Sequence, residues 1–149
     1  MTVRQTDASL AAKFDGRIAR LHFPAHTSDS GRLTPLDLAA LPLVVVRAFV
    51  VNASDGALRG GHAHRTGREL LVCLAGEIEV ELQYGEVAAG VVLDATRNAL
   101  MIAAPVWSRQ RYRGLAPSLL VLSDTAYDPR AYEYDSLTPP NPNIPFDAA

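Results

Sequence analysis

Cysteine and lysine are almost absent from this sequence, since each occurs once in 149 residues. The single cysteine, Cys73, lies in an apolar run and cannot form an internal disulfide. This excludes a small extracellular domain held together by disulfides, and a cytoplasmic protein is expected. The one lysine stands against thirteen arginines. Arginine offers planar, forked donors that suit phosphate oxygens.

Long apolar runs and an excess of charge of one sign are also missing. No apolar run approaches the roughly 18 residues of a membrane span, and the stretch 1–14 has no apolar core of signal-peptide length. The net charge is −2, so there is no bulk attraction to nucleic acid or anionic lipid. We expect neither nucleic acid nor a membrane as a partner. With 48% hydrophobic residues, the chain should form one domain with a sizeable core.

Short apolar runs alternate with turn residues along the chain. A spacing of about ten residues with many β-branched side chains is typical of an all-β sandwich or barrel. Helices are expected only near 34–41 and 128–134. The expected strands cover 17–23, 41–51, 69–75, 77–83, 86–93, 99–104, 108–114 and 118–124.

These segments predict one domain over 1–137, in which residues 1–16 are flexible. The proline-rich end, 138–149, is expected to be either a disordered tail or an extended arm on a neighbour. The run 41–51 is apolar apart from Pro42 and Arg47, as in a strand covered on both faces. A second subunit would supply that cover, so a homodimer is expected.

Two of the four histidines, His62 and His64, are separated by one residue. On a strand, residues i and i+2 point to the same face, so both imidazoles would project together. Gly60 and Gly61 just before them allow the backbone to approach another group closely. A metal site, an acid–base pair or a polar strand entrance would each fit this pattern.

The spacing of Gly56, His62, His64, Glu69 and Gly76 resembles the first motif of the cupin superfamily. In metal-binding cupins the two histidines and the glutamate of this motif are ligands. Three protein ligands with an open position would suit a catalytic metal.

The second cupin motif, Pro-x-Gly-x-x-His, corresponds here to residues 105–110. Trp107 replaces its glycine, and Gln110 stands where the last histidine ligand would be. A neutral amide is a poor substitute for imidazole on a transition metal. The first motif therefore favours a metal and the second does not.

Over a longer part of the chain, the sequence resembles one smaller group within the cupins. The stretch "LRGGHAHRTGRELLVCLAGEIEVEL" resembles the sugar 3,4-ketoisomerases, the WxcM-like cupins that act on dTDP-4-keto-6-deoxyglucose. The resemblance extends over about residues 18–137. Further similar segments are "SDSGRLTPLD", "LPLVVVRAF", "LMIAAPVWS" and "LVLSDTAYDPRAYEYDSL".

This resemblance implies a cupin jelly-roll barrel (a double-stranded β-helix), a homodimer with exchanged N-terminal strands, and no metal or other cofactor. The family reaction moves a ketone from C4 to C3 of a dTDP-linked keto-deoxy sugar. His62 and His64 would be the catalytic acid–base groups.

The residues themselves suit that chemistry. A ketone at C4 acidifies the C3 proton, and imidazoles can exchange protons near neutral pH as an enediol forms and collapses. Arg47 would steady an oxyanion or a phosphate. Arg59 and Arg32 would bind the pyrophosphate. Trp107 would either stack on the thymine or sugar, or pack in the core.

The sequence departs from the family pattern at several polar positions. Glu69 replaces a glutamine, so it would either favour the charged form of His64 or complete a metal triad. Phe49 replaces a tyrosine, Ser108 replaces a histidine, and Arg32 is displaced along the chain. A metal-dependent cupin enzyme using His62, His64 and Glu69, or a non-catalytic sugar-binding cupin, are the alternatives.

The segment 108–114 alternates two kinds of side chain. If it is a strand, Arg109, Arg111 and Arg113 share one face, which is expected to face solvent rather than form a phosphate rail. Ser108, Gln110 and Tyr112 would then face the pocket, and we take Gln110 and Tyr112 as substrate-binding candidates. Three tyrosines near the end are expected to pack or to form a lid: Tyr127, Tyr132 and Tyr134.

Overall fold

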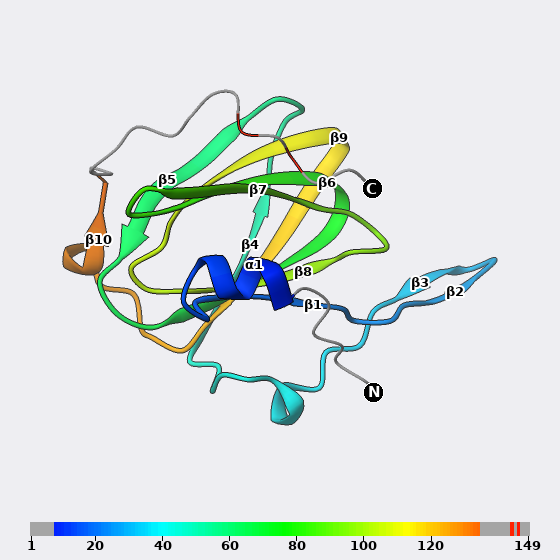
Figure 1. The fold of residues 1–149 in the computed structure, drawn as a ribbon. Helices are drawn as coiled ribbons and strands as arrows, with labels where there is room; N and C mark the ends of the chain where they lie inside the picture. Colours follow the sequence, from blue (N-terminus) through cyan, green and yellow to red (C-terminus); the bar gives the residue numbers. More distant parts are fainter. Residues whose placement is uncertain (1–7, 135–143, 145, 147–149) are drawn as a thin grey trace.

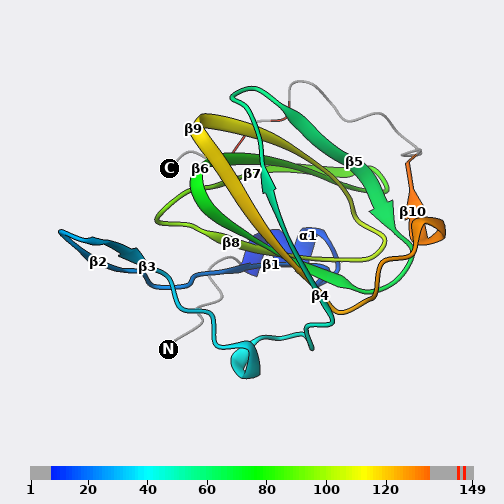
Figure 2. The same ribbon diagram turned by 180° about the vertical axis from the view of Figure 1, so that it is seen from behind.

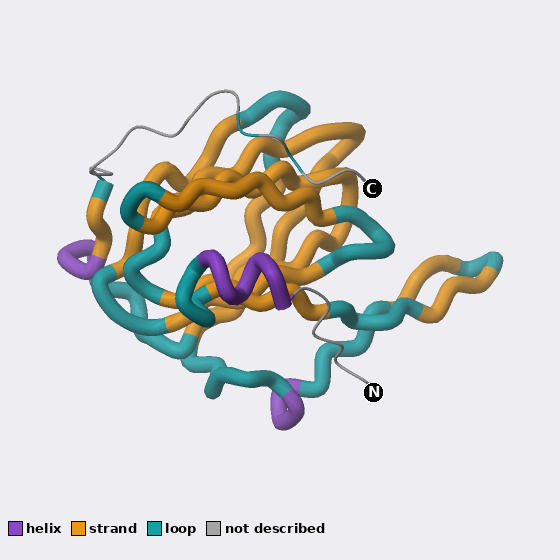
Figure 3. Tube along the Cα trace, in the orientation of Figure 1, coloured by secondary structure: helices purple, strands orange, loops and turns teal. Residues whose placement is uncertain are grey.

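Strands make up most of the molecule, as the expected all-β class requires (Figures 1 and 3). The computed structural model describes residues 8–134, 144 and 146. The helical elements are α1 (Ala8–Lys13), η1 (Leu38–Ala40) and η2 (Pro129–Ala131). The strands are β1 (Ile18–Leu21), β2 (His26–Ser28), β3 (Gly31–Leu33), β4 (Arg47–Asn52), β5 (Leu58–His64), β6 (Arg68–Tyr84), β7 (Val87–Leu93), β8 (Ala99–Ala103), β9 (Trp107–Ser123) and β10 (Tyr132–Glu133).

The strands β6 and β9 form the spine of the fold. Each has 17 residues, and they pair antiparallel along both of their halves. The sequence predicted a break within each strand, but the chain continues as a strand through an irregular register between Cys73 and Glu77. The turn residues at this point bend the strands without ending them, because an irregular register bends a strand and increases its twist.

The two halves of this spine belong to two facing layers. The first half of β6 and the second half of β9 pair with β8 and β4, and β1 extends this layer beyond β8. The second half of β6 and the first half of β9 pair with β7 and β5, and β10 extends that layer beyond β5. The expected jelly-roll architecture of a cupin is confirmed.

Alternation along the strands fills the space between the layers with apolar side chains. Leu71, Ile78, Val80 and Leu119 belong to this inner core. Residues 1–16 were expected to be flexible, but from Ala8 onward the chain forms α1 and its turn. Phe14 and Leu10 are buried against the same core, as expected for apolar side chains on one helix face.

A second apolar cluster covers the outside of the first layer. Leu70, Val72 and Leu122 point outward from β6 and β9, where Phe23 and Leu43 cover them. The segment 41–46 thus contributes cover as loop, and only the end of the expected strand 41–51 forms β4. This arrangement explains why the sequence there is apolar almost throughout.

Other expectations needed correction. The helices expected near 34–41 and 128–134 are single short turns, η1 and η2. The first turn ends at Leu41, whose backbone is extended, because the residue before a proline is biased away from the helical region. A hairpin of β2 and β3 that the sequence did not predict projects from the barrel (Figures 1 and 2). The proline-rich tail, 138–149, lies outside the described residues apart from Ile144 and Phe146, and Phe146 bridges to Gly90 on β7.

No helix in the described part of the chain has the length and hydropathy needed to cross a membrane.

The close approach of β6 to β9 at their irregular register depends on Gly76. Its φ of +71° is left-handed, and a Cβ there would lie 2.6 Å from the carbonyl oxygen of Arg113. Gly16 has almost the same φ, +72°, with nothing within 4 Å. We expect Gly16→Ala to lower the free energy of unfolding by about 1–2 kcal/mol. Gly76→Ala should cost about 1–3 kcal/mol more, from overpacking.

Chemical denaturation of the two alanine variants beside the parent protein measures this difference. Equal destabilisation would contradict the close approach at Gly76.

Candidate active site

A cavity opens between the two layers of the barrel. Its volume is about 650 Å³, counted out to its open mouth. The floor is apolar and the rim is polar, as in many small-molecule sites. The lining residues are Arg47, Phe49, Val51, Arg59, Gly60, His62, Glu69, Leu71, Ser108, Gln110, Tyr112, Leu119, Val121 and Tyr132.

One wall of the cavity carries a row of polar residues across three strands. Arg47 on β4 lies opposite Ser123 on β9, and Ser123 lies opposite Glu69 on β6. Directly opposite residues of an antiparallel pair point to the same face. The row therefore brings an arginine and a glutamate to the inner face of the first layer.

The second wall carries the histidine pair, and the expected common face is confirmed. His62 and His64 lie on β5 with ring centroids 5.1 Å apart. His62 lines the main cavity, while His64 lines a smaller adjoining hollow that Glu69 also borders. The two imidazoles therefore have different access to a bound molecule.

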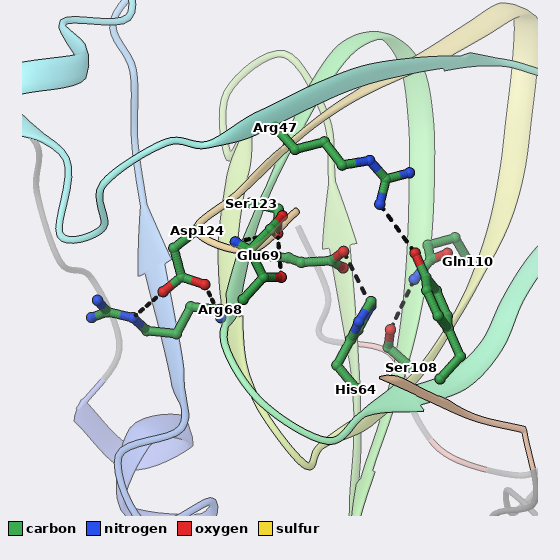
Figure 4. A network of polar contacts seen from close by, with 10 residues as sticks. Arg47, His64, Arg68, Glu69, Ser108, Gln110, Ser123 and Asp124 are labelled. Atoms are coloured by element: carbon green, nitrogen blue, oxygen red, sulfur yellow. Dashed lines mark hydrogen bonds and ion pairs between the residues drawn. The ribbon is translucent and has the colours of Figure 1, made fainter. Parts of the chain in front are cut away.

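Glu69 reaches from the first wall to His64 in the second (Figure 4). Its Oε1 lies 3.1 Å from Nε2 of His64, and both side chains are less than a fifth exposed. The Nε2 atom is buried and makes no well-aligned hydrogen bond among the described residues. The contact is thus one of charge and proximity, in which a proton on His64 would face a carboxylate.

His62 experiences a different environment. Burial lowers the pKa of His62 from its ordinary value, and the neighbouring His64 lowers it further. Glu69 and the backbone of Gly60 act in the opposite direction, but the net shift is downward. A lowered pKa keeps an imidazole neutral, so it can accept a proton at neutral pH.

Aromatic rings close the site above the histidines. The ring centroid of Tyr132 lies 4.8 Å from that of His62 and 4.6 Å from that of His64. Tyr134 lies 5.7 Å from His62. The Tyr132 hydroxyl accepts a hydrogen bond of 3.1 Å from Nη1 of Arg47, which joins the two walls.

The alternation predicted for 108–114 agrees with the structure. Ser108, Gln110 and Tyr112 line the cavity. Gln110 donates to the Ser108 hydroxyl at 3.0 Å (Figure 4), and a Cβ on Gly60 would lie 2.6 Å from the Gln110 Oε1. Burial raises the pKa of Tyr112 to about 12, so this phenol stays protonated at neutral pH.

The three arginines of β9 face the other side of that layer. Nε of Arg109 donates to Glu81 at 2.8 Å, and Arg111 and Arg113 lie 3.6 and 3.4 Å from Glu79. They form partly exposed ion pairs with β6, as the prediction of an outward face requires.

Two expected site residues lie neither in the cavity nor in the adjoining hollow that His64 lines. Trp107 is odd-numbered on β9, so it shares the outer face, where it is buried beside the guanidinium of Arg109. Arg32 lies on the projecting hairpin and donates to the carbonyl oxygen of Ala95 at 2.8 Å. Arg59 does line the cavity and is exposed.

Sequence reasoning assigned Tyr132 to packing or to a lid, although it lines the cavity beside His62. The available signal was its place in the segment "AYEYD", which alternates like a strand. The register of β10 against β5, which pairs Tyr132 with His64, could not be read from the sequence because these residues are distant in the chain.

Within the described residues, no three His, Cys, Asp or Glu side chains are grouped in a way that would hold a metal ion.

This architecture and polar cavity define the chain as a cupin-type jelly roll. A family model named FdtA and described as "WxcM-like, C-terminal" matches residues 17–138. Because this match covers most of the chain, the chain belongs to that family, as the resemblance in its motifs predicted.

Relatives of known activity share this family or fold. The TDP-4-oxo-6-deoxy-alpha-D-glucose-3,4-oxoisomerase of Aneurinibacillus thermoaerophilus is 28% identical over 99 residues, which are 64% of this chain and 71% of that protein. The 3,4-ketoisomerase QdtA from Thermoanaerobacterium thermosaccharolyticum, solved with TDP, is 25% identical with a TM-score of 0.72, covering 80% of this chain and 88% of that one. NovW, a 4-keto-6-deoxy sugar epimerase from Streptomyces spheroides, is 14% identical and shows the fold alone (TM-score 0.73, covering 99% and 84%).

The electrostatic account of His62 can be tested by NMR titration of the histidine ring signals. We expect the pKa of His62 to lie below 6.5. His64→Asn should raise it, because a like charge is removed, and Glu69→Gln should lower it further, because a favourable carboxylate is removed.

The ring signal of the exposed His26 is the internal reference, since this residue lies on the β2–β3 hairpin and lines no part of the cavity. A pKa of His62 at or above 6.5 in the parent, or shifts of the opposite sign, would show that burial does not control this imidazole.

Proposed function

We propose that this chain is a nucleotide-sugar 3,4-ketoisomerase that moves the keto group between C4 and C3 of a dTDP-4-keto-6-deoxyhexose. The observation that carries the proposal is the pairing of a half-buried, cavity-lining His62 with a second imidazole. The activities of the relatives and the family membership support the same reaction.

The reaction would begin at C3. Neutral His62 takes the C3 proton, the C3–H electrons form the C3–C4 double bond, and the C4 carbonyl electrons move onto O4. A proton is then returned at C4, while the hydroxyl proton of O3 is lost and O4 gains one. The C3 carbonyl forms, so no external oxidant or reductant is needed.

Different surroundings support a division of labour between the two imidazoles. Low pKa suits His62 to the carbon proton. His64, beside Glu69, is suited to hold a proton that moves between the sugar oxygens. Glu69 stands where the family has a glutamine. In this proposal it takes part in the acid–base chemistry and does not act as a metal ligand.

The nucleotide would lie outside the barrel. Arg59, exposed on the rim of the cavity, is positioned to pair with the pyrophosphate. A cytoplasmic location, where such sugar nucleotides would be met, stays a prediction.

Turnover of TDP-4-keto-6-deoxyglucose, followed by NMR, tests the function. We expect the parent protein to form the 3-keto isomer. His62→Asn and His64→Asn should each lower turnover by about 10²–10⁴, the usual contribution of general acid–base catalysis. His22→Asn, a histidine that lines no part of the cavity, is the matched control and should keep turnover.

Absence of turnover and of solvent deuterium exchange, across several dTDP-keto sugars, would favour a non-catalytic sugar-binding cupin. Stoichiometric iron, zinc or manganese required for turnover would favour the metal-dependent alternative at His62, His64 and Glu69.

We further propose a homodimer with exchanged N-terminal strands. Apolar side chains are left uncovered before and along β4: Val44, Val46 and Val50 are 80%, 60% and 51% exposed. The β2–β3 hairpin projects from the barrel, and all residues of its two strands are exposed. A second copy would bury the valines and receive the hairpin.

Sedimentation analysis should therefore give twice the 16.0 kDa mass of the chain. Val46→Glu combined with Val50→Glu should yield monomers, because burying two carboxylates in an apolar interface is costly. Leu115→Glu, which alters a residue that is 96% exposed on another part of the surface, should stay dimeric. A monomeric parent protein would refute the dimer.

A further inference from the structure

Tyr132 combines three contacts that a packing residue does not need. It lines the main cavity beside His62, its ring packs edge-on against His62 and at a tilt against His64, and its hydroxyl accepts a hydrogen bond from Arg47. Its position is fixed by the pairing of β10 with β5 and by the backbone bond from Arg65 to Ala131. The phenol is therefore held in contact with both groups that would move protons.

The direction of the Arg47 bond determines where the phenol proton points. A guanidinium has only donors, so the Tyr132 oxygen must be the acceptor. Its own proton is consequently directed away from Arg47. No described residue accepts it, and the cavity that Tyr132 lines is the space available to a hydrogen-bond acceptor.

Arg47 is itself held in place. Its guanidinium carbon lies 4.6 Å from the ring centroid of Phe49 and 4.9 Å from that of Tyr127. Stacking of this kind orients the planar group. A hydroxyl that accepts from a cation is polarised and becomes a stronger donor, so Arg47 can act through Tyr132 without touching a bound sugar.

We infer that Tyr132 is a further catalytic residue, whose hydroxyl donates a hydrogen bond to the sugar oxygen that becomes negative as the C3 proton leaves. This inference rests on the proposed ketoisomerase function. Arg47 is the positioning residue behind it and polarises the donor.

The inferred step needs no oxidant, reductant or proton donor from outside the site. The C3–H bond breaks and its proton goes to His62; the electron pair forms the C3–C4 double bond; and the carbonyl electrons collect on O4. Tyr132 keeps its proton and shares it with O4 through the hydrogen bond. Fixed donors aimed at developing charge are among the strongest contributions to catalysis.

The test is steady-state kinetics of Tyr132→Phe with TDP-4-keto-6-deoxyglucose. This variant keeps the ring and removes only the hydroxyl. We expect kcat to fall by about 10²–10³, as when one oxyanion donor is lost. KM should hardly change, because the interaction forms mainly in the transition state. Tyr84→Phe, which alters a half-buried tyrosine that lines no part of the cavity, is the control and should keep kcat.

A double-mutant cycle separates catalysis from packing. Arg47→Met should lower kcat by less than Tyr132→Phe. Because Arg47 acts through Tyr132, the double variant should be no slower than Tyr132→Phe alone. Thermal unfolding of each variant establishes that it is folded under the conditions of the assay.

The possible results are distinct. A parent protein without turnover would overturn the proposed function and this inference together. A parent protein with turnover beside an equally active, folded Tyr132→Phe would overturn only the role of Tyr132. So would a rise in KM at unchanged kcat, since that would mean ground-state binding, and so would additive losses in the cycle, since Arg47 would then act independently.

Discussion

The antiparallel pairing of β6 with β9 is the interaction on which the rest of the molecule depends. It runs through both layers of the barrel, and its register puts Glu69 opposite Ser123 in one layer. The pairing of β9 with β5 puts His62 opposite Ser108 in the other. Because side chains alternate along each strand, these two registers determine which polar groups enter the cavity. A slip of one residue would turn all of them to the outside.

The electrostatic environments of the two histidines differ, although only one residue separates them in the sequence. Burial and a like neighbour keep His62 neutral, whereas His64 faces the carboxylate of Glu69 at 3.1 Å. Pairs of titratable groups in contrasting surroundings are typical of acid–base sites. Glu69, the residue on which the metal and acid–base interpretations of the sequence divide, points at one imidazole. In our account it serves proton transfer.

Much of this could be predicted from the sequence, and the reason is periodicity. Alternation predicted the common face of His62 and His64 and the inward face of Gln110, and the motifs predicted the family. Long-range register was beyond reach: nothing local indicates that Tyr132 lies opposite His64. For Trp107 the sequence left stacking on the ligand and core packing open, and its odd position on β9 turns it to the other face, where it is buried. Arg32 was assigned to the pyrophosphate by its chemistry and lies on a hairpin whose strands have no strong apolar pattern.

The central claim is that a keto sugar binds with its reacting carbon at His62 and its carbonyl oxygen at Tyr132. A crystal structure of His62→Asn with TDP-4-keto-6-deoxyglucose tests this most directly. We predict that C3 lies within about 3–3.5 Å of the residue 62 side chain, the range of a near-attack geometry. The C4 carbonyl oxygen should lie within hydrogen-bond distance of the Tyr132 hydroxyl. A sugar with C3 turned away from β5, or bound outside the cavity, would contradict the account.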